Sequence, residues 1–259
     1  MKRALALSLA VLSSPAAAEG WHATEREKSS AQNNVPVTLE LYYQAGKLRI
    51  DQGPDMSSIF DLGTGRLTVL NHKQKSFVTD TFEELAKIRD AMIANTKKQL
   101  ASFPPELRKD LETKIKALDR KSVELPAPTG KKSTVGPYSC QEYRTTSAIT
   151  ETTICVVQDV GVPMADFNRR AKAMTDRLHK LKMGGAEGPG GVALFEAARF
   201  GFPVRSLSRV TVGGQRFDTE TELVAIKAED IPPERFEVPK NYTVSRPPDL
   251  APPPMPREK

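Results

Sequence analysis

The chain has 259 residues, with 38 lysines and arginines against 32 aspartates and glutamates and a pI of about 9.2. This length is enough for one large domain, or two small ones, with a hydrophobic core. The basic balance does not predict nucleic-acid binding, because positive side chains are interspersed with negative ones along the chain. We expect a solvated surface of mixed charge, with a weak attraction to anionic lipid headgroups as the alternative.

Residues 1–18 have the pattern of a secretory signal peptide. Lys2 and Arg3 precede an apolar run, and a group of small residues ends at Ala18. We therefore predict cleavage after Ala18 and a periplasmic, or else secreted, protein. No later apolar run approaches the roughly 20 residues that span a bilayer, so the sequence predicts no transmembrane segment. No cysteine follows the predicted cut, and we expect no lipid anchor there.

The first predicted strands follow directly. Residues 21–31 are polar and alternate in character, which predicts an edge strand. In residues 35–43 every second side chain is apolar, and the next 36 residues continue that alternation between Gly-, Pro- and Asn-rich turns. The pattern predicts an antiparallel meander with one apolar face. On that face we place Leu39, Leu41, Leu48, Ile50, Leu67 and Val69.

Two amphipathic helices are predicted after the meander, at about 82–100 and 105–118. Thr81 and Glu84 have the spacing of a capping box at the start of the first helix. Pro104-Pro105 separates the two, because proline blocks helix continuation yet suits a first turn. Each helix has one apolar stripe, so each can cover a sheet face without burying itself completely.

A third helix is predicted from Pro163 to Lys182, followed by a short one at 192–199. The third helix has a narrow apolar seam that includes Met164, Phe167 and Met174. A single helix of this kind indicates a core element rather than half of a coiled coil. The methionines make its apolar surface adaptable.

The only two cysteines are Cys140 and Cys155, in two predicted strands. With a turn at Ser147-Ala148, paired residues have numbers that sum to 295, which places the cysteines opposite each other. A disulfide is expected in an oxidising compartment, whereas a metal pair or a redox dithiol lacks the usual ligand spacing. Residues 119–136, before this hairpin, are turn-rich and predict a surface connection.

A closing hairpin is predicted from residues 202–212 and 217–226. The segment after it predicts a turn that tucks Phe236 and Val238 inward. Residues 246–259 are rich in proline and predict an extended tail, either disordered or reaching a partner or the cell wall.

Four short motifs occur in a fixed order along the chain: Gly46-Lys-x-Arg-x-Asp51, Gly136-Pro-Tyr-Ser-Cys140 with its hairpin to Cys155, Gly201-Phe-Pro-Val-Arg205, and the segment from Ile231 to Tyr242. Over residues 22–245 the chain resembles domain of unknown function 4412, a family of exported bacterial proteins similar to the LolA and LolB lipoprotein carriers. The resemblance implies an α+β fold: a strongly curved antiparallel sheet, an unclosed barrel, with amphipathic helices on its concave face. In the carriers the apolar space between sheet and helices receives acyl chains. The disulfide hairpin is not part of the carrier pattern, and no carrier functional residue matches a position here.

These features favour a non-enzymatic periplasmic binding or carrier protein for lipid or acylated cargo. The candidate ligand-binding residues are the six sheet positions, Leu39, Leu41, Leu48, Ile50, Leu67 and Val69, with Met164, Phe167 and Met174 from the helix. For each of them plain core packing is the competing interpretation. The alternative function is an envelope module that binds a protein or cell-wall material and whose core is filled by its own side chains.

An enzyme is not predicted. The three histidines, His22, His72 and His179, have no serine, cysteine or metal-ligand partner at motif spacing. We accordingly predict no catalytic residue, no metal and no cofactor.

Overall fold

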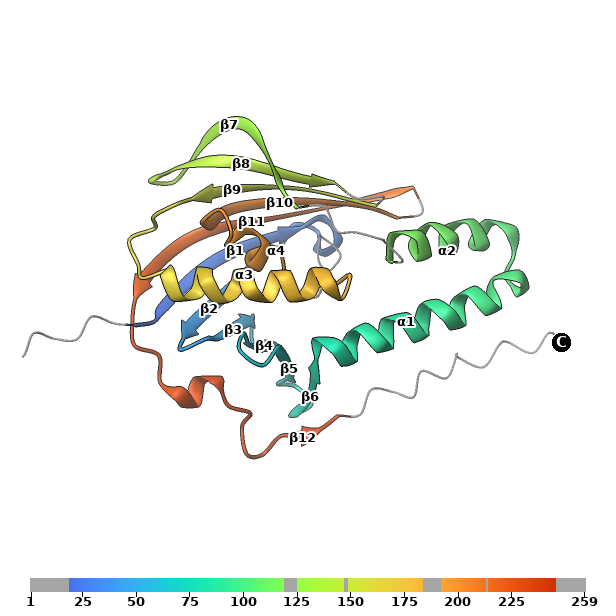
Figure 1. Ribbon diagram of the computed structural model, residues 1–259, viewed down its shortest axis with the longest axis horizontal. Coiled ribbons are helices and arrows are strands. Elements are labelled where there is room, and N and C mark those ends of the chain that lie inside the picture. The colour runs from blue at the N-terminus through green and yellow to red at the C-terminus, as the bar shows by residue number, and fades with distance from the viewer. Residues whose placement is uncertain (1–18, 119–124, 147–148, 184–191, 213, 246–259) are drawn as a thin grey trace, which may run out of the picture.

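The computed structural model describes residues 19–118, 125–146, 149–183, 192–212 and 214–245 (Figure 1). They form one 12-stranded sheet in the order β12-β6-β5-β4-β3-β2-β1-β11-β10-β9-β8-β7. Every neighbouring pair is antiparallel except β12 and β6, which are parallel. The sheet curves around α3 without closing into a barrel (Figure 1), as expected of an α+β protein with an open, curved sheet.

The strands of the first half alternate regularly, as predicted. They are β1 (Trp21–Ser29), β2 (Val37–Gln44), β3 (Lys47–Gln52), β4 (Met56–Asp61), β5 (Arg66–Asn71) and β6 (Ser76–Thr81). Those of the second half are β7 (Ala127–Val135), β8 (Tyr138–Thr146), β9 (Thr150–Val157), β10 (Phe202–Val212), β11 (Gln215–Ala228) and β12 (Thr243–Val244).

Four α-helices accompany the sheet in the described ranges. They are α1 (Phe82–Gln99), α2 (Pro105–Leu118), α3 (Ala165–Lys180) and α4 (Val192–Ala197). Short 3₁₀ turns occur at η1 (Ser30–Gln32), η2 (Leu100–Ser102) and η3 (Pro233–Phe236). The predicted capping box starts α1: the Glu84 N–H donates to the Thr81 hydroxyl, and the Thr81 N–H donates to the Glu84 carboxylate at 2.7 Å.

Three expectations about the sheet are wrong. The predicted edge strand β1 lies between β2 and β11, because Trp21, Ala23 and Glu25 alternate as buried residues inside it. The predicted connection at 119–136 contains the strand β7, which pairs with β8 although most of its side chains are exposed. The polar sequences of β1 and β7 do not predict these positions, because the pairing of each strand depends on the strands beside it in the sheet.

The third wrong expectation is the register of the cysteine hairpin. Cys155 pairs with Glu142 rather than with Cys140, a shift of two residues that keeps each side chain on its predicted face. The disulfide is nevertheless formed between Cys140 and Cys155, diagonally across β8 and β9, with a Cα–Cα distance of 5.4 Å. The turn on which the predicted register was centred, together with the predicted signal peptide and Pro-rich tail, lies outside the described residues.

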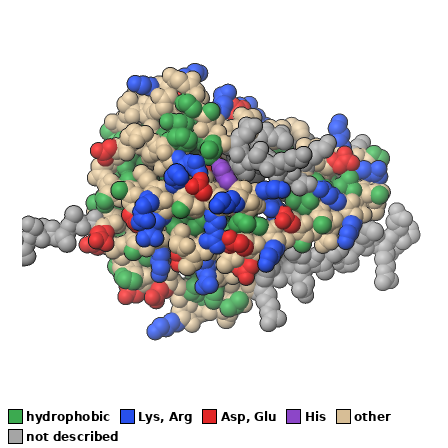
Figure 2. All heavy atoms as spheres, in the orientation of Figure 1, with side chains coloured by type: hydrophobic (Ala, Val, Ile, Leu, Met, Phe, Trp, Pro, Cys, Tyr) green, Lys and Arg blue, Asp and Glu red, His purple; other side chains and the backbone are tan. Residues whose placement is uncertain are grey.

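Both faces of the first half of the sheet are covered. The concave face packs on α3 and α4 in one large apolar cluster. On the convex face, the segment after β11 lays Ile231 and Phe236 over Ile59 and Leu70, with Val238 packed against them. The predicted inward turn of Phe236 and Val238 is therefore confirmed. Elsewhere the surface carries interspersed cationic and anionic side chains, as Figure 2 shows for the face with α3.

Candidate functional site

All nine predicted ligand-binding residues come together on the concave side of the sheet. Eight are buried members of the central cluster and Val69 is partly buried against it. The strands β2, β3 and β5 supply six of them, while α3 and the residue before it supply three: Leu39, Leu41, Leu48, Ile50, Leu67, Val69, Met164, Phe167 and Met174. Side chains of the protein itself fill the space between them, since Phe60 of β4 packs edge-on against Phe195 of α4 at 5.2 Å.

An aromatic group forms the centre of this cluster, and the sequence interpretation missed its main member. Trp21 is fully buried, stacks on Tyr43 at 5.5 Å and makes edge contacts with Phe167 and Phe202 at 5.3 and 5.6 Å. It was overlooked because its strand reads as polar. Since Trp21 is the only tryptophan of the chain, its fluorescence reports directly on this core.

Polar contacts fix α3 against the sheet at its N-terminal end. The Tyr43 hydroxyl donates to Asp166 at 2.5 Å, and Arg170 donates to the same carboxylate at 2.9 Å. Burial and the hydrogen bond to Asp166 raise the pKa of Tyr43 well above its usual value. Burial opposes ionisation of Asp166, but the hydrogen bonds from Tyr43 and Arg170 outweigh it and lower the pKa of that carboxyl.

A second polar anchor lies nearer the C-terminal end of α3. Arg177 donates to both carboxylate oxygens of Glu83, at 2.6 and 2.7 Å, and to the Thr64 carbonyl at 2.7 Å. The guanidinium lies directly over Gly65, where a Cβ atom would come within 2.1 Å of it. Gly65 also has φ +72°, a conformation that favours glycine. The two anchors hold α3 in place, and between them the Thr175 hydroxyl donates to the Phe195 carbonyl at 3.0 Å, which ties α3 to α4.

The apolar stripe of α1 begins in the core and runs out of it. Phe82 is fully buried and Leu85 packs against the central cluster. Further along, Ile88 is half-buried and Met92 is 50% exposed. Ile93 and Ile115 of the α1–α2 pair are buried but belong to none of the three apolar clusters formed by the described residues. Apolar helix surface thus continues beyond the packed core.

Beyond the apolar cluster, the concave face becomes polar. Glu25 is buried between Leu39 and Leu223, its partners on β2 and β11. Glu27 is half-buried on the same face and hydrogen-bonds to the Thr221 side chain. Burial, with a smaller contribution from Glu27, raises the pKa of Glu25 to about 7, and burial also raises that of Glu27. Neither carboxyl was predicted as a site residue.

On the convex face, a chain of hydrogen bonds joins the sheet to the segment after β11. Arg49 and Ser57 both donate to Asp51, each at 2.5 Å, and His72 Nε2 lies 2.6 Å from the Ser57 hydroxyl. His72 Nδ1 lies 2.6 Å from the Tyr242 hydroxyl. Because Ser57 gives its proton to Asp51, the bonds are satisfied when His72 Nε2–H donates to Ser57 and Tyr242 donates to Nδ1.

The hydrogen-bond chain contains a Ser–His pair, but the direction of proton donation between the two residues is the reverse of that needed for nucleophilic catalysis. A nucleophilic serine needs a base that accepts its proton, whereas His72 here donates to Ser57. Ser57 is also only 1% exposed. The geometry fits a structural role, in which the chain fastens Tyr242 and its segment to the sheet.

A cleft of about 640 Å³ lies beside this hydrogen-bond chain, between the convex face of the sheet and the segment after β11. The Arg235 guanidinium covers the Tyr42 ring at 4.1 Å and Arg49 forms part of the wall. Ile231, Val238 and two prolines supply its apolar lining, and Glu229, Glu234, Glu237 and Lys240 supply further charges. The cleft was not predicted, because residues nearly 200 positions apart create it.

Within the described ranges, no set of three or more His, Cys, Asp or Glu side chains is arranged to hold a metal ion. No helix in those ranges combines the length and the apolar character that crossing a membrane requires.

The fold and site define an open-sheet α+β protein with a helix held in the concave face of the sheet. The chain belongs to the DUF4412 family, a domain of unknown function, whose profile matches residues 55–242. No curated protein sequence matches the chain significantly.

Among solved structures, that of PNGF-II in space group C2 is similar, with 10% identity and a TM-score of 0.43. The P2₁ form of PNGF-II gives 7% identity and a TM-score of 0.42. Both matches cover 88% of this chain and 31% of the PNGF-II chain, so this chain spans about a third of the length of those proteins.

Proposed function

We propose that this protein is a non-enzymatic binding or carrier protein of the cell envelope for a lipid or acylated ligand. One observation carries the proposal: the apolar stripe of α1 continues from the buried Phe82 through the partly buried Leu85 and Ile88 to the exposed Met92. An acyl chain can lie along such a stripe and remove it from water, with a gain of roughly 0.8 kcal/mol per buried methylene. The resemblance to the LolA and LolB carriers supports the same ligand class.

Side chains fill the space between α3 and the sheet, so such a ligand would have to enter at the border of the central cluster. Met164 and Met174 lie in the apolar seam of α3, and methionine adapts its shape to different neighbours. The ligand would first contact α1 and α2, then take the place of side chains at the border of the central cluster. The predicted wall residues deeper in the cluster serve mainly as core.

Native mass spectrometry of protein purified from its own envelope without detergent tests the proposal. We expect a co-purifying lipid or acyl species near one per chain, identified by solvent extraction. Met92→Glu should reduce its occupancy without unfolding the protein, because Met92 is already 50% exposed. Leu207→Glu, which changes a 40% exposed side chain on β10, is the matched control. A chain that stays free of ligand even when lipid is offered would refute the proposal.

A second candidate is an envelope interaction module with a self-filled core. The tight packing of the nine predicted residues and the convex cleft under Arg235 favour it. In that case Arg235→Ala would abolish capture of an envelope partner, while Met92→Glu would leave capture unchanged. The opposite pattern would support the carrier function.

A further inference from the structure

The concave face holds two carboxyls that no cation of the described residues neutralises. Glu25 and Glu27 are two positions apart on β1, so they share a face and lie about 7 Å apart along the strand. Glu25 is 8% exposed and has neither a hydrogen bond nor an ion pair among the described residues. A buried carboxyl without a partner is costly, and this makes it unusual.

The strand pairing shows why the neighbouring strands in the described ranges supply no cation. Glu25 pairs with Leu39 and Leu223, and Glu27 pairs with Val37 and Thr221. By alternation, the lysines and arginines of the nearest strands lie on the opposite face: Arg26 and Lys28 of β1, Arg205 and Arg209 of β10, Arg216 and Lys227 of β11. Arg205, Arg209, Arg216 and Lys227 form ion pairs with carboxylates, whereas Arg26 and Lys28 lie opposite Glu222 and Glu220 in the strand register.

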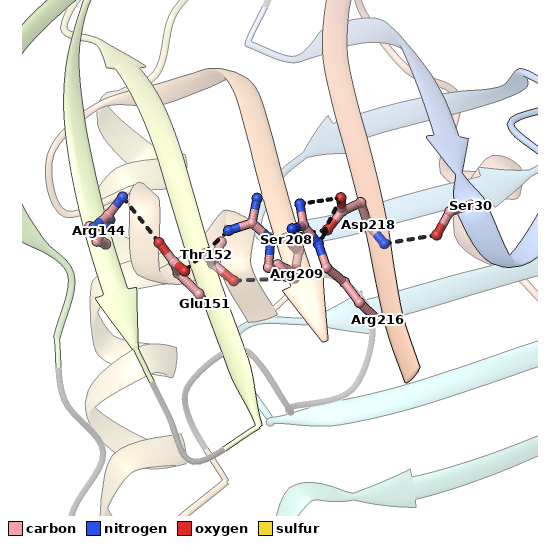
Figure 3. A network of polar contacts seen from close by, with 8 residues as sticks. All are labelled: Ser30, Arg144, Glu151, Thr152, Ser208, Arg209, Arg216 and Asp218. Atoms are coloured by element: carbon pink, nitrogen blue, oxygen red, sulfur yellow. Dashed lines mark hydrogen bonds and ion pairs between the residues drawn. The ribbon is translucent and has the colours of Figure 1, made fainter. Parts of the chain in front are cut away.

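Figure 3 shows one row of this convex ladder, in which Glu151 lies between Arg144 and Arg209, and Asp218 lies between Arg209 and Arg216. The concave side of the same strands carries hydroxyls instead. Thr152 hydrogen-bonds to Ser208 at 3.2 Å (Figure 3), and Thr219 donates to Ser29 at 3.2 Å. The convex face thus carries cations together with carboxylates, whereas the concave face of these strands holds two carboxyls among hydroxyls and leucines.

We propose that Glu25 and Glu27 bind the positively charged head of an amphiphilic ligand, an alkylammonium group. The two carboxylates together match one ammonium, which offers three hydrogen-bond donors. Leu39 and Leu223 flank Glu25 and continue into the apolar cluster, so an attached chain has apolar surface beside the head. Glu27, which is only half-buried, leaves the pair accessible. The raised pKa of Glu25 agrees with a buried carboxyl whose ionised form would be stabilised by a bound cation.

This inference rests on the proposed function and specifies the head group of its ligand. It is tested with three probes of equal chain length, decylammonium, decanol and decanoate, titrated into the full-length mature protein at about pH 8.5. Trp21 fluorescence and calorimetry report binding. We expect decylammonium to bind at least about tenfold more tightly than the other two, as a charge-assisted contact provides.

Glu25→Gln combined with Glu27→Gln should lower the affinity for decylammonium to that for decanol and leave decanol binding unchanged. Glu220→Gln, on the exposed face of β11, is the control and should change neither affinity. If decanol and decanoate bind but decylammonium has no advantage, or keeps it in the double variant, the head-group assignment is wrong while the carrier function stands. If none of the probes binds, both proposals fail.

Discussion

Replacing Glu25 by glutamine should stabilise the protein by an amount that grows as the pH rises from about 4.5 to 7 and is constant at higher pH. The pKa of this carboxyl is raised from its ordinary 4.5 to about 7 in the folded state. Below about pH 4.5 the group is protonated in both folded and unfolded chains, so it costs nothing. As the pH rises from about 4.5 to 7, the unfolded chain releases a proton that the folded chain retains, so folding stability falls over this interval and levels off above it.

The size of the effect follows from this shift. A difference of roughly 2.5 pKa units corresponds to about 3 kcal/mol of unfolding free energy once the pH is well above 7. Glutamine keeps the shape of the side chain and cannot ionise, so it avoids this cost. We expect Glu25→Gln to equal the wild type near pH 4.5 and to exceed it by up to about 3 kcal/mol near pH 8.5.

Urea denaturation followed by the fluorescence of Trp21 measures this difference, because Trp21 is fully buried in the central cluster. With a slope of about 2–3 kcal/mol per molar urea, the midpoint of the variant should rise by about 1 M near pH 8.5. Glu220→Gln, on the exposed face of β11, serves as the control. A gain that is equal at both pH values, or a loss near pH 8.5, would show that Glu25 is not an isolated buried carboxyl.

Three further changes test other parts of the structure. Cys140→Ser with Cys155→Ser should cost about 3 kcal/mol through loss of the disulfide, seen as a lower urea midpoint that reducing agent does not lower further; a midpoint equal to that of the oxidised wild type would contradict a stabilising crosslink. Phe167→Ala should cost about 3–5 kcal/mol, because the ring is fully buried against Trp21, and unchanged thermal unfolding would argue against this packing. Tyr242→Phe removes the hydroxyl partner of His72 and should cost about 1 kcal/mol while speeding hydrogen exchange in the segment after β11; exchange at the wild-type rate would mean that the bond does not fasten that segment.

Local patterns in the sequence predicted the helices and the meander well. The capping box at Thr81, the Pro104-Pro105 break and the seam of α3 are each decided by neighbouring residues, and the helix bounds agree to within three residues at each end. The apolar face from Leu39 to Val69 was equally clear, because alternation of period two fixes which side chains share a face.

Features that depend on distant partners could not be predicted in this way. The position of β1 in the middle of the sheet depends on its pairing with β11 at the other end of the chain. The convex hydrogen-bond chain joins Ser57 and His72 to Tyr242, three residues with no common motif. That Glu25 has no ion pair could not be predicted, because it depends on which face of the sheet the neighbouring cations occupy. This follows only from the register of β1 with β11.

The pairing of β1 with β11 also sets the order in which the molecule can be completed. Trp21 pairs with Ala228, so the centre of the sheet forms only after nearly the whole described chain is available. Until then, the strands β1–β6 have an open edge at β1, and the strands β7–β10 have an open edge at β10. Contacts between such distant segments fold slowly, and exposed edges can pair with other chains. A newly made chain therefore has a period in which two unfinished half-sheets need protection, and β11 ends that period by pairing with β1 on one side and with β10 on the other.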